Sequence, residues 1–178
     1  AAQRVDFFIA NSKNVADRIE KYYRRQSIII HPPVETKNFQ INNNIGKYFL
    51  TGGRLVAYKR FDVAIQAFNR LGIPLKIFGT GPEEKKLKSL AKNNVEFLGK
   101  ITQEELANLY SQAIAFVHPQ IEDFGITAVE SMASGRPVIA FAAGGACETV
   151  VEGKTGKFFD EQTWEALADT IVRFKPEE

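Results

Sequence analysis

Short apolar runs rich in β-branched and aromatic residues alternate along this chain with longer amphipathic stretches. Runs of this length are typical of strands buried on both faces, and strands that alternate with helices are typical of a parallel sheet covered by helices. The pattern therefore predicts a doubly wound α/β fold. The expected strands are Val5–Ala10, Ser27–His31, Tyr48–Thr51, Leu75–Phe78, Val95–Leu98, Ala113–Val117 and Pro137–Phe141.

The stretches between these runs carry apolar residues at helical spacing. The clearest stripes lie within Val15–Tyr22, Phe61–Leu71 and Trp164–Ile171. Thr102, followed three residues later by Glu105, predicts a capping box at the start of another helix. We interpret the stripes as faces that pack on the sheet, because a stripe of this width usually faces a core.

Ligands of doubly wound folds bind beside the carboxyl ends of the strands, so the residues after each strand are the candidates for chemistry. Gly53, Arg54 and Lys59 follow the expected strand Tyr48–Thr51. Glycine lets the backbone approach a ligand closely, and the two cations suit phosphate oxygens. This turn is a predicted anion site, with an ordinary turn followed by solvated basic residues as the alternative.

The turn after Leu75–Phe78 begins like a dinucleotide-binding fingerprint, with Gly79 and Gly81. Glu84 stands where the third glycine would be, next to another glutamate, and these carboxylates would repel a pyrophosphate. A nicotinamide or flavin site is therefore not expected. The two glycines still permit close approach of a ligand, and an ordinary turn is the alternative.

The loop that carries Glu122 leads to a helix expected to begin near Gly125 or Ile126, whose free N–H groups and dipole favour phosphate. Glu122 and Glu130 are eight residues apart, which is about 12 Å of helical rise. Glycosidase carboxylates stand about 5 to 9.5 Å apart, so a hydrolytic pair is disfavoured. The spacing instead favours two carboxylates that bind hydroxyls at opposite ends of a long ligand, with a diphosphate between them. An exposed loop acid and an ordinary surface glutamate are the alternative.

The composition of the chain argues against several classes of protein. The 178 residues include 23 Lys and Arg against 21 Asp and Glu, a formal charge of +2, which gives no reason to expect a nucleic-acid partner. The single cysteine, Cys147, and two histidines exclude a disulfide framework and a zinc-finger pattern. We interpret Cys147 as a packing residue. We interpret His118 as a packed or solvent-facing imidazole, with contact to a ligand at its strand end as the alternative. The longest apolar run, Val138–Ala143, is far shorter than the roughly 20 residues of a membrane span.

Taken together, the motifs resemble those of retaining glycosyltransferases of family 4, which have the GT-B fold. The resemblance rests on Glu122 and Glu130 with Phe124-Gly125-Ile126 between them, and on the segments 53–59, 79–82, 97–99 and 151–156 in the same order. It covers nearly the whole chain. It implies that residues 1–178 form a single Rossmann-like nucleotide-sugar-binding domain, the C-terminal half of such an enzyme, and that the N-terminal acceptor domain is absent from this chain.

The resemblance also implies roles for individual residues. Arg54 and Lys59 would contact the donor diphosphate and stabilise the charge that develops on the leaving group. Glu122 would bind hydroxyls of the transferred sugar, and Glu130 those of the ribose. No obligatory metal or other cofactor is implied. The further donor-binding positions are Gly53, Gly79, Gly81, Lys100, Ile101, Phe124, Gly125, Ile126 and Thr127.

Two residues depart from the family pattern. Arg60 stands after Lys59 where a glycine is usual, so a further positive charge is expected near the phosphates. Gln120 stands where a serine is common, which leaves the contacts of that loop open.

The implied reaction moves a hexose from a nucleotide sugar to a glycan or lipid-linked acceptor. The connector Pro32–Phe39 is similar to that of mannosyltransferases and indicates GDP-mannose, while UDP with glucose, galactose or N-acetylglucosamine stays open. The alternatives are half of a sugar-nucleotide epimerase and a non-catalytic nucleotide-sugar-binding or interaction domain. The expected location is cytoplasmic, with the full-length protein peripheral at the inner membrane face. The isolated domain is expected to bind donor but to transfer little.

Overall fold

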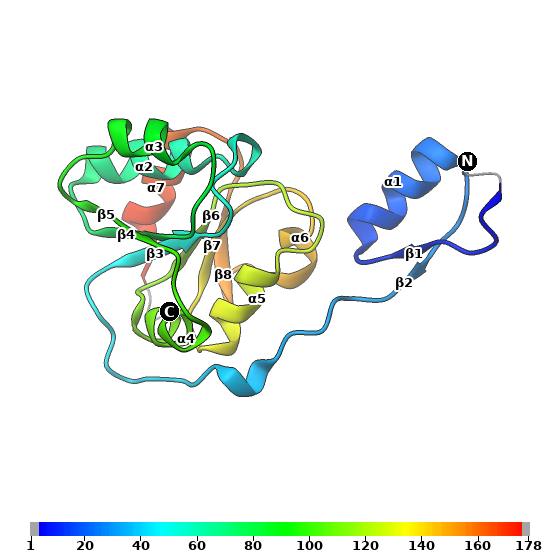
Figure 1. Cartoon of the computed structure of the whole chain (residues 1–178), viewed down its shortest axis with the longest axis horizontal. Coiled ribbons are helices and arrows are strands. Elements are labelled where there is room, and N and C mark those ends of the chain that lie inside the picture. Colours follow the sequence, from blue (N-terminus) through cyan, green and yellow to red (C-terminus); the bar gives the residue numbers. More distant parts are fainter. Residues whose placement is uncertain (1–3, 176–178) are drawn as a thin grey trace.

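The computed structural model describes residues 4–175, which form two parts joined by an extended connector (Figure 1). The smaller part, here called the N-terminal unit, comprises residues 4–31. It contains β1 (Ile9–Ala10), α1 (Lys13–Tyr23) and β2 (Ile28–Ile29), and the two strands pair in parallel. Ser12 starts α1 because its side chain accepts a hydrogen bond from the Val15 N–H at 3.1 Å.

The larger part is built on a parallel sheet of six strands with the order β5-β4-β3-β6-β7-β8. This order reverses direction between β3 and β6, which defines a doubly wound sheet and confirms the predicted fold class. The crevice for a ligand therefore lies at the carboxyl ends of β3 and β6. The strands are β3 (Phe49–Gly52), β4 (Leu75–Phe78), β5 (Val95–Gly99), β6 (Phe116–His118), β7 (Val138–Phe141) and β8 (Gly156–Phe159).

Two details of the predicted sheet are wrong. The first two expected strands pair only with each other and do not join the main sheet. Their apolar residues are largely exposed: Ile9 is 64% and Ile28 59% accessible to solvent. In addition, β8 was not predicted. It is only four residues long, begins with glycine and contains a lysine, and those residues weaken the strand signal.

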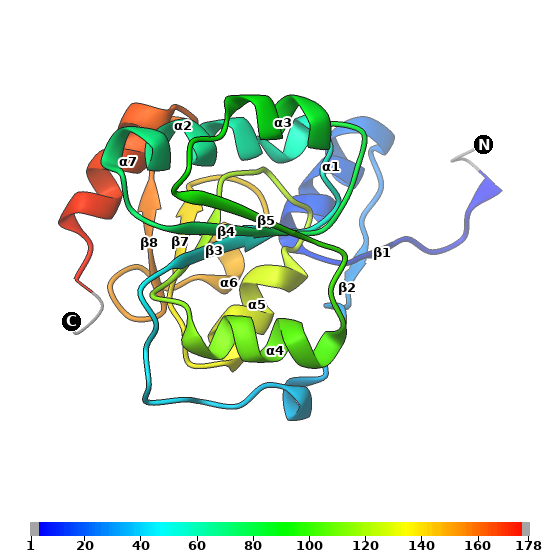
Figure 2. The ribbon, with the colours of Figure 1, turned by 60° about the vertical axis from the view of Figure 1, so that its left-hand side comes forward.

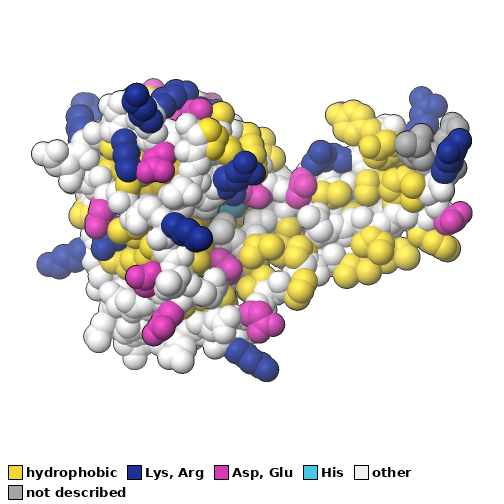
Figure 3. Space-filling model, viewed as in Figure 1, with side chains coloured by type: hydrophobic (Ala, Val, Ile, Leu, Met, Phe, Trp, Pro, Cys, Tyr) yellow, Lys and Arg dark blue, Asp and Glu magenta, His cyan; other side chains and the backbone are white. Residues whose placement is uncertain are grey.

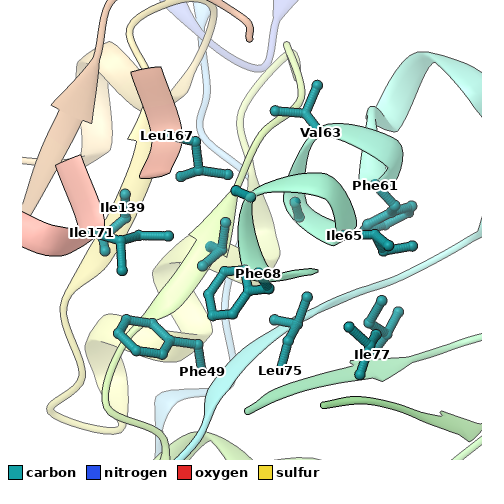
Figure 4. Packing of buried hydrophobic residues seen from close by; sticks show 14 of the residues in the cluster. Phe49, Phe61, Val63, Ile65, Phe68, Leu75, Ile77, Ile139, Leu167 and Ile171 are labelled. Carbon is teal, nitrogen blue, oxygen red and sulfur yellow. The ribbon is translucent and has the colours of Figure 1, made fainter. Parts of the chain in front are cut away.

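Helices cover both faces of the sheet, as the amphipathic stripes predict (Figure 2). One face packs against α2, α3 and α7, where Phe68 and Leu167 lie on the sheet residues Leu75 and Ile139 (Figure 4). The other face packs against α4, α5 and α6 around Tyr110. The helices are α2 (Phe61–Leu71), α3 (Glu84–Leu90), α4 (Gln103–Gln112), α5 (Ile126–Ala133), α6 (Ala146–Thr149) and α7 (Trp164–Arg173), with short 3-10 turns η2 (Thr36–Asn38) and η3 (Ala57–Lys59).

Local signals place the helix starts correctly. Thr102 and Glu105 form the predicted capping box of α4. Gly125 starts α5 from a left-handed conformation, φ 88°. Within residues 4–175, no helix has the length and apolar character that spanning a membrane requires.

Candidate active site at the switch point of the sheet

The crevice between β3 and β6 brings together two of the predicted site residues. Leu50 of β3 lies opposite Phe116 of β6, so the loops that follow these strands leave the sheet side by side. η3 carries Lys59 on the first loop, and the loop after β6 carries Glu122. Lys59 Nζ lies 2.8 Å from Glu122 Oε1, and their side chains are only 13% and 22% exposed. This ion pair places a positive and a negative charge, both partly desolvated, at the point where a doubly wound sheet binds ligands.

The pair lines an open pocket of about 350 Å³ that also contains the start of α5. Gly125, Ile126 and Thr127 form that part of the wall, and Asn11 of the N-terminal unit lies on another side. Among residues 4–175 no side chain caps α5, and the first turn of this helix carries no acidic residue. The N–H groups of Ile126 and Thr127 at this helix start are therefore available to an anion, and the helix dipole favours one.

Glu130 lies one helical turn further along α5, on the side that faces α4. The Tyr110 hydroxyl donates a hydrogen bond of 3.2 Å to Glu130 Oε2. Burial raises the pKa of Glu130, and the hydrogen bond from Tyr110 opposes that change. Burial also raises the pKa of Tyr110 well above 10, so the phenol stays a proton donor. Tyr110 was not singled out from the sequence, because its meeting with Glu130 is a contact between two helices.

His118 ends β6 beneath the pocket and is fully buried. Neither of its ring nitrogens has a hydrogen-bond partner among residues 4–175. Burial lowers the pKa of His118 to about 4, although the Glu122 carboxylate opposes the shift. The imidazole is therefore neutral at neutral pH. Its complete burial confirms that His118 is a packed side chain.

The buried His118 makes folding stability depend on pH. The folded-state pKa is about 4 and the ordinary value about 6.5, so the unfolded chain takes up the proton first. The free energy of unfolding is therefore not reduced by His118 above pH 6.5. As the pH falls from 6.5 toward 4, protonation of His118 in the unfolded chain lowers it by about 3 kcal/mol in total. Urea unfolding between pH 7.5 and 4.5 measures this loss. The His118→Leu variant should lose this pH-dependent decrease in stability, and the His31→Ala variant should keep it. If stability falls with pH as steeply in His118→Leu as in the wild type, His118 is not its source.

The glycines Gly79 and Gly81 serve the backbone rather than the pocket wall. A Cβ on Gly79 would overlap the Gly53 carbonyl oxygen, and one on Gly81 would overlap the backbone of Leu55. Gly53 itself lies beside Lys59, since a Cβ there would stand 3.2 Å from the lysine Nζ. The glycine pattern therefore packs the turns after β3 and β4 against each other, which fixes the position of Lys59.

Other predicted site residues lie outside the pocket wall. Arg54 is exposed on the turn after β3, and among the described residues its guanidinium has no partner. Lys100 is exposed just beyond the end of β5, and Ile101 packs against the core on the α4 side. Phe124, in contrast, belongs to the pocket wall: it is 8% exposed and lies in the loop between Glu122 and α5.

Two expectations about side chains are wrong. Arg60 does not add charge to the pocket, because its guanidinium bonds Asp62 at 3.1 Å and Gln162 Oε1 at 3.1 Å. Cys147 is exposed instead of packed in the core. Gln120 takes up a supporting position, since its side chain is buried and its Nε2 lies 3.4 Å from Glu122 Oε1.

A metal site was not expected from the sequence, and that stays a prediction. Over residues 4–175, no group of three or more His, Cys, Asp or Glu side chains is arranged to hold a metal ion.

Comparison with known proteins points to one family. The family profile described as Glycosyl transferases group 1 matches residues 33–178. An uncharacterized glycosyltransferase of Methanocaldococcus jannaschii is 29% identical over 97% of this chain and 50% of its own length. A GDP-mannose-dependent alpha-mannosyltransferase of Corynebacterium glutamicum is 35% identical over 67% of this chain and 30% of its own length. The chain thus spans half or less of the length of each of these two relatives.

A solved structure shares the fold. Anabaena HepE, in complex with UDP and glucose, aligns with a TM-score of 0.86 over 97% of this chain and 54% of its own, at 22% identity. The fold is that of the GT-B glycosyltransferases, as predicted. Because the family profile covers most of the chain, including every element of the six-stranded sheet, the chain belongs to the group 1 glycosyl transferases.

Proposed function

We propose that this chain is the donor-binding part of a retaining glycosyltransferase of family 4, which transfers a hexose from a nucleotide sugar. One observation carries the proposal: the partly buried Lys59–Glu122 pair faces the start of α5, which no side chain of residues 4–175 caps, in the pocket at the switch point of the sheet. A cation and a helix start suit a diphosphate, and a neighbouring carboxylate suits sugar hydroxyls. Glu130, held by Tyr110, would bind the ribose.

Charge balance indicates how the pocket would work. In the unliganded chain, Lys59 and Glu122 neutralise each other at 2.8 Å. A diphosphate at the start of α5 competes with Glu122 for the lysine, and the released carboxylate is then free to accept hydrogen bonds from the sugar. As the bond from the sugar to the diphosphate breaks, negative charge grows on the leaving group. Lys59 would stabilise that charge together with Arg54, whose guanidinium has no partner among residues 4–175.

The donor we propose is GDP-mannose. The Pro32–Phe39 connector and the named activity of the Corynebacterium relative support it. The UDP and glucose bound to Anabaena HepE make a UDP-sugar the competing choice. We propose no metal requirement, which is tested by comparing donor binding with excess chelator and with Mg²⁺. The binding constants should agree.

An acceptor domain outside this chain is part of the proposal, with a glycan or lipid-linked acceptor at the cytoplasmic face of the membrane. Its support comes from the N-terminal unit, where apolar side chains gather on the surface (Figure 3). Phe7 is 80% exposed, Ile9 64% and Ile30 56%. Parallel strands are normally covered on both faces. Further polypeptide packed on β1 and β2 would provide that cover.

Calorimetric titration of the chain with GDP, UDP and ADP, followed by GDP-mannose and UDP-glucose, tests the donor proposal. GDP and GDP-mannose should bind most tightly, and Glu130→Ala should weaken both. Tighter binding of UDP and UDP-glucose would overturn the mannosyl assignment alone. If no nucleotide binds the chain or the full-length protein, the proposed function is wrong.

Tyr110→Phe tests the link between α4 and Glu130. Removal of one hydroxyl frees the carboxylate to rotate, and the affinity for the preferred nucleoside diphosphate should fall about two- to tenfold, the scale of one hydrogen bond. Tyr48→Phe is the matched control, because the Tyr48 hydroxyl donates to the Leu109 carbonyl instead. Equal affinities of the two variants would show that Tyr110 does not position Glu130.

A further inference from the structure

Besides lining the pocket with Asn11, the N-terminal unit contacts a short loop that forms part of the pocket wall. This segment, here called the donor loop, is Glu122–Gly125. Arg18 Nη1 lies 2.6 Å from Asp123 Oδ1. The rings of His31 and Phe124 stack with their centroids 5.3 Å apart. Both middle residues of the donor loop are therefore held by side chains from the N-terminal unit.

A third contact joins the same two parts beside the loop. The Glu148 carboxylate of α6 accepts hydrogen bonds from the backbone N–H groups of Lys13 and Asn14, both at 2.8 Å. His31 Nε2 lies 3.8 Å from the same carboxylate. A carboxylate at a helix start gains from charge-assisted hydrogen bonds and from the helix dipole. Glu148 thus caps α1 from the other part of the chain.

The turn before α6 holds the other side of the donor loop. Gly145 N donates a hydrogen bond of 2.8 Å to the Glu122 carbonyl oxygen. Any side chain at Gly145 would overlap the backbone of Phe124. The donor loop therefore lies between this turn and the N-terminal unit, and Glu148 ties those two neighbours together.

We propose that Arg18, His31 and Glu148 form a latch by which the N-terminal unit keeps the donor loop in the shape that binds donor. They are positioning residues, and the inference rests on the proposed function. The Arg18–Asp123 pair is more than half exposed, and one such pair contributes little by itself. The latch works because Arg18 and His31 contact two adjacent residues of the loop that carries Glu122 and leads into α5, while Glu148 holds the N-terminal unit that supplies them.

Titration of latch variants with the nucleoside diphosphate preferred by the wild type tests the proposal. Glu148→Ala should weaken binding about tenfold, since it removes two charge-assisted hydrogen bonds. Arg18→Ala should weaken it about two- to fivefold, the range of an exposed ion pair. His31→Ala should weaken it and His31→Phe, which keeps a stacking ring, should restore it. Hydrogen exchange at amides 122–127 should accelerate in the unliganded variants that lose affinity.

Arg25→Ala is the matched control. Its guanidinium bonds the Val5 and Asp6 carbonyls and lies over the Phe8 ring, within the N-terminal unit. It should leave affinity and donor-loop exchange unchanged. Equal losses in Arg25→Ala and Arg18→Ala, or unchanged affinity in every latch variant of a chain that binds nucleotide, would overturn the latch. A wild-type protein that binds no nucleotide would instead overturn the proposed function.

Discussion

Replacement of Lys59 by alanine is expected to lower the affinity for the donor diphosphate about 10- to 100-fold, the scale of charge-assisted hydrogen bonds. In the full-length enzyme it should lower the rate of transfer by about 10²- to 10³-fold, as for loss of one preorganised group that stabilises developing charge. The substitution removes the cation at Lys59 and leaves the Glu122 carboxylate, which is 22% exposed, without its cationic partner. That lone carboxylate then repels the diphosphate.

Arg60→Ala provides the control from the adjacent position. Its guanidinium is held by Asp62 and Gln162, so its loss should leave nucleotide affinity within about twofold of the wild type, as expected for a group that does not contact the ligand. Titration calorimetry measures binding in both variants, and initial rates measure transfer in the full-length enzyme. Equal losses in the two variants would show that the effect of Lys59 is one of general charge.

The second large effect is on stability. Gly79→Ala should lower the free energy of unfolding by about 3 to 5 kcal/mol, or prevent folding, because large losses follow from backbone overlap and from strained dihedral angles. Gly79 has φ 99°, and a Cβ there would overlap the carbonyl group of Gly53. The only relief is separation of the turns after β3 and β4. Urea unfolding monitored by circular dichroism measures the loss.

Gly99→Ala separates steric overlap from backbone strain. Gly99 also has a positive φ, 69°, but a Cβ there meets no atom of the described residues 4–175 within 4 Å. The expected loss is about 1 to 2 kcal/mol, the cost of a left-handed conformation for a residue with a side chain. If both variants lose the same free energy, the close approach of Gly79 to Gly53 does not stabilise the fold.

The sequence predicts the larger part of this molecule well because its signals are local. Strands such as Leu75–Phe78 coincide with compact apolar runs, and the Thr102–Glu105 box acts within one helical turn. The start of α5 at Gly125 follows from the same kind of signal. The carboxyl ends of neighbouring parallel strands meet at one edge of the sheet. Local signals that place Lys59 after β3 and Glu122 after β6 therefore also place both residues at that edge.

Features that depend on contacts distant in sequence could not be predicted. Arg60 is absent from the pocket wall, and one of the two side chains that hold its guanidinium, Gln162, lies about a hundred residues further along the chain. The Tyr110 hydroxyl of α4 donates a hydrogen bond to the Glu130 carboxylate of α5. Glu148 caps a helix that begins 135 residues earlier. No pattern within one segment records such pairs. The separate pairing of β1 and β2 is likewise decided by the arrangement of the two parts.

A crystal structure of this chain with its preferred nucleoside diphosphate tests the central claim most directly. The account predicts the diphosphate at the start of α5, within hydrogen-bond distance of Lys59 Nζ and the N–H groups of Ile126 and Thr127, with the ribose hydroxyls at Glu130. It also predicts that the hydrogen bond from Lys59 to Glu122 is replaced by one to phosphate. A nucleotide bound elsewhere, with the Lys59–Glu122 pair intact, would contradict it.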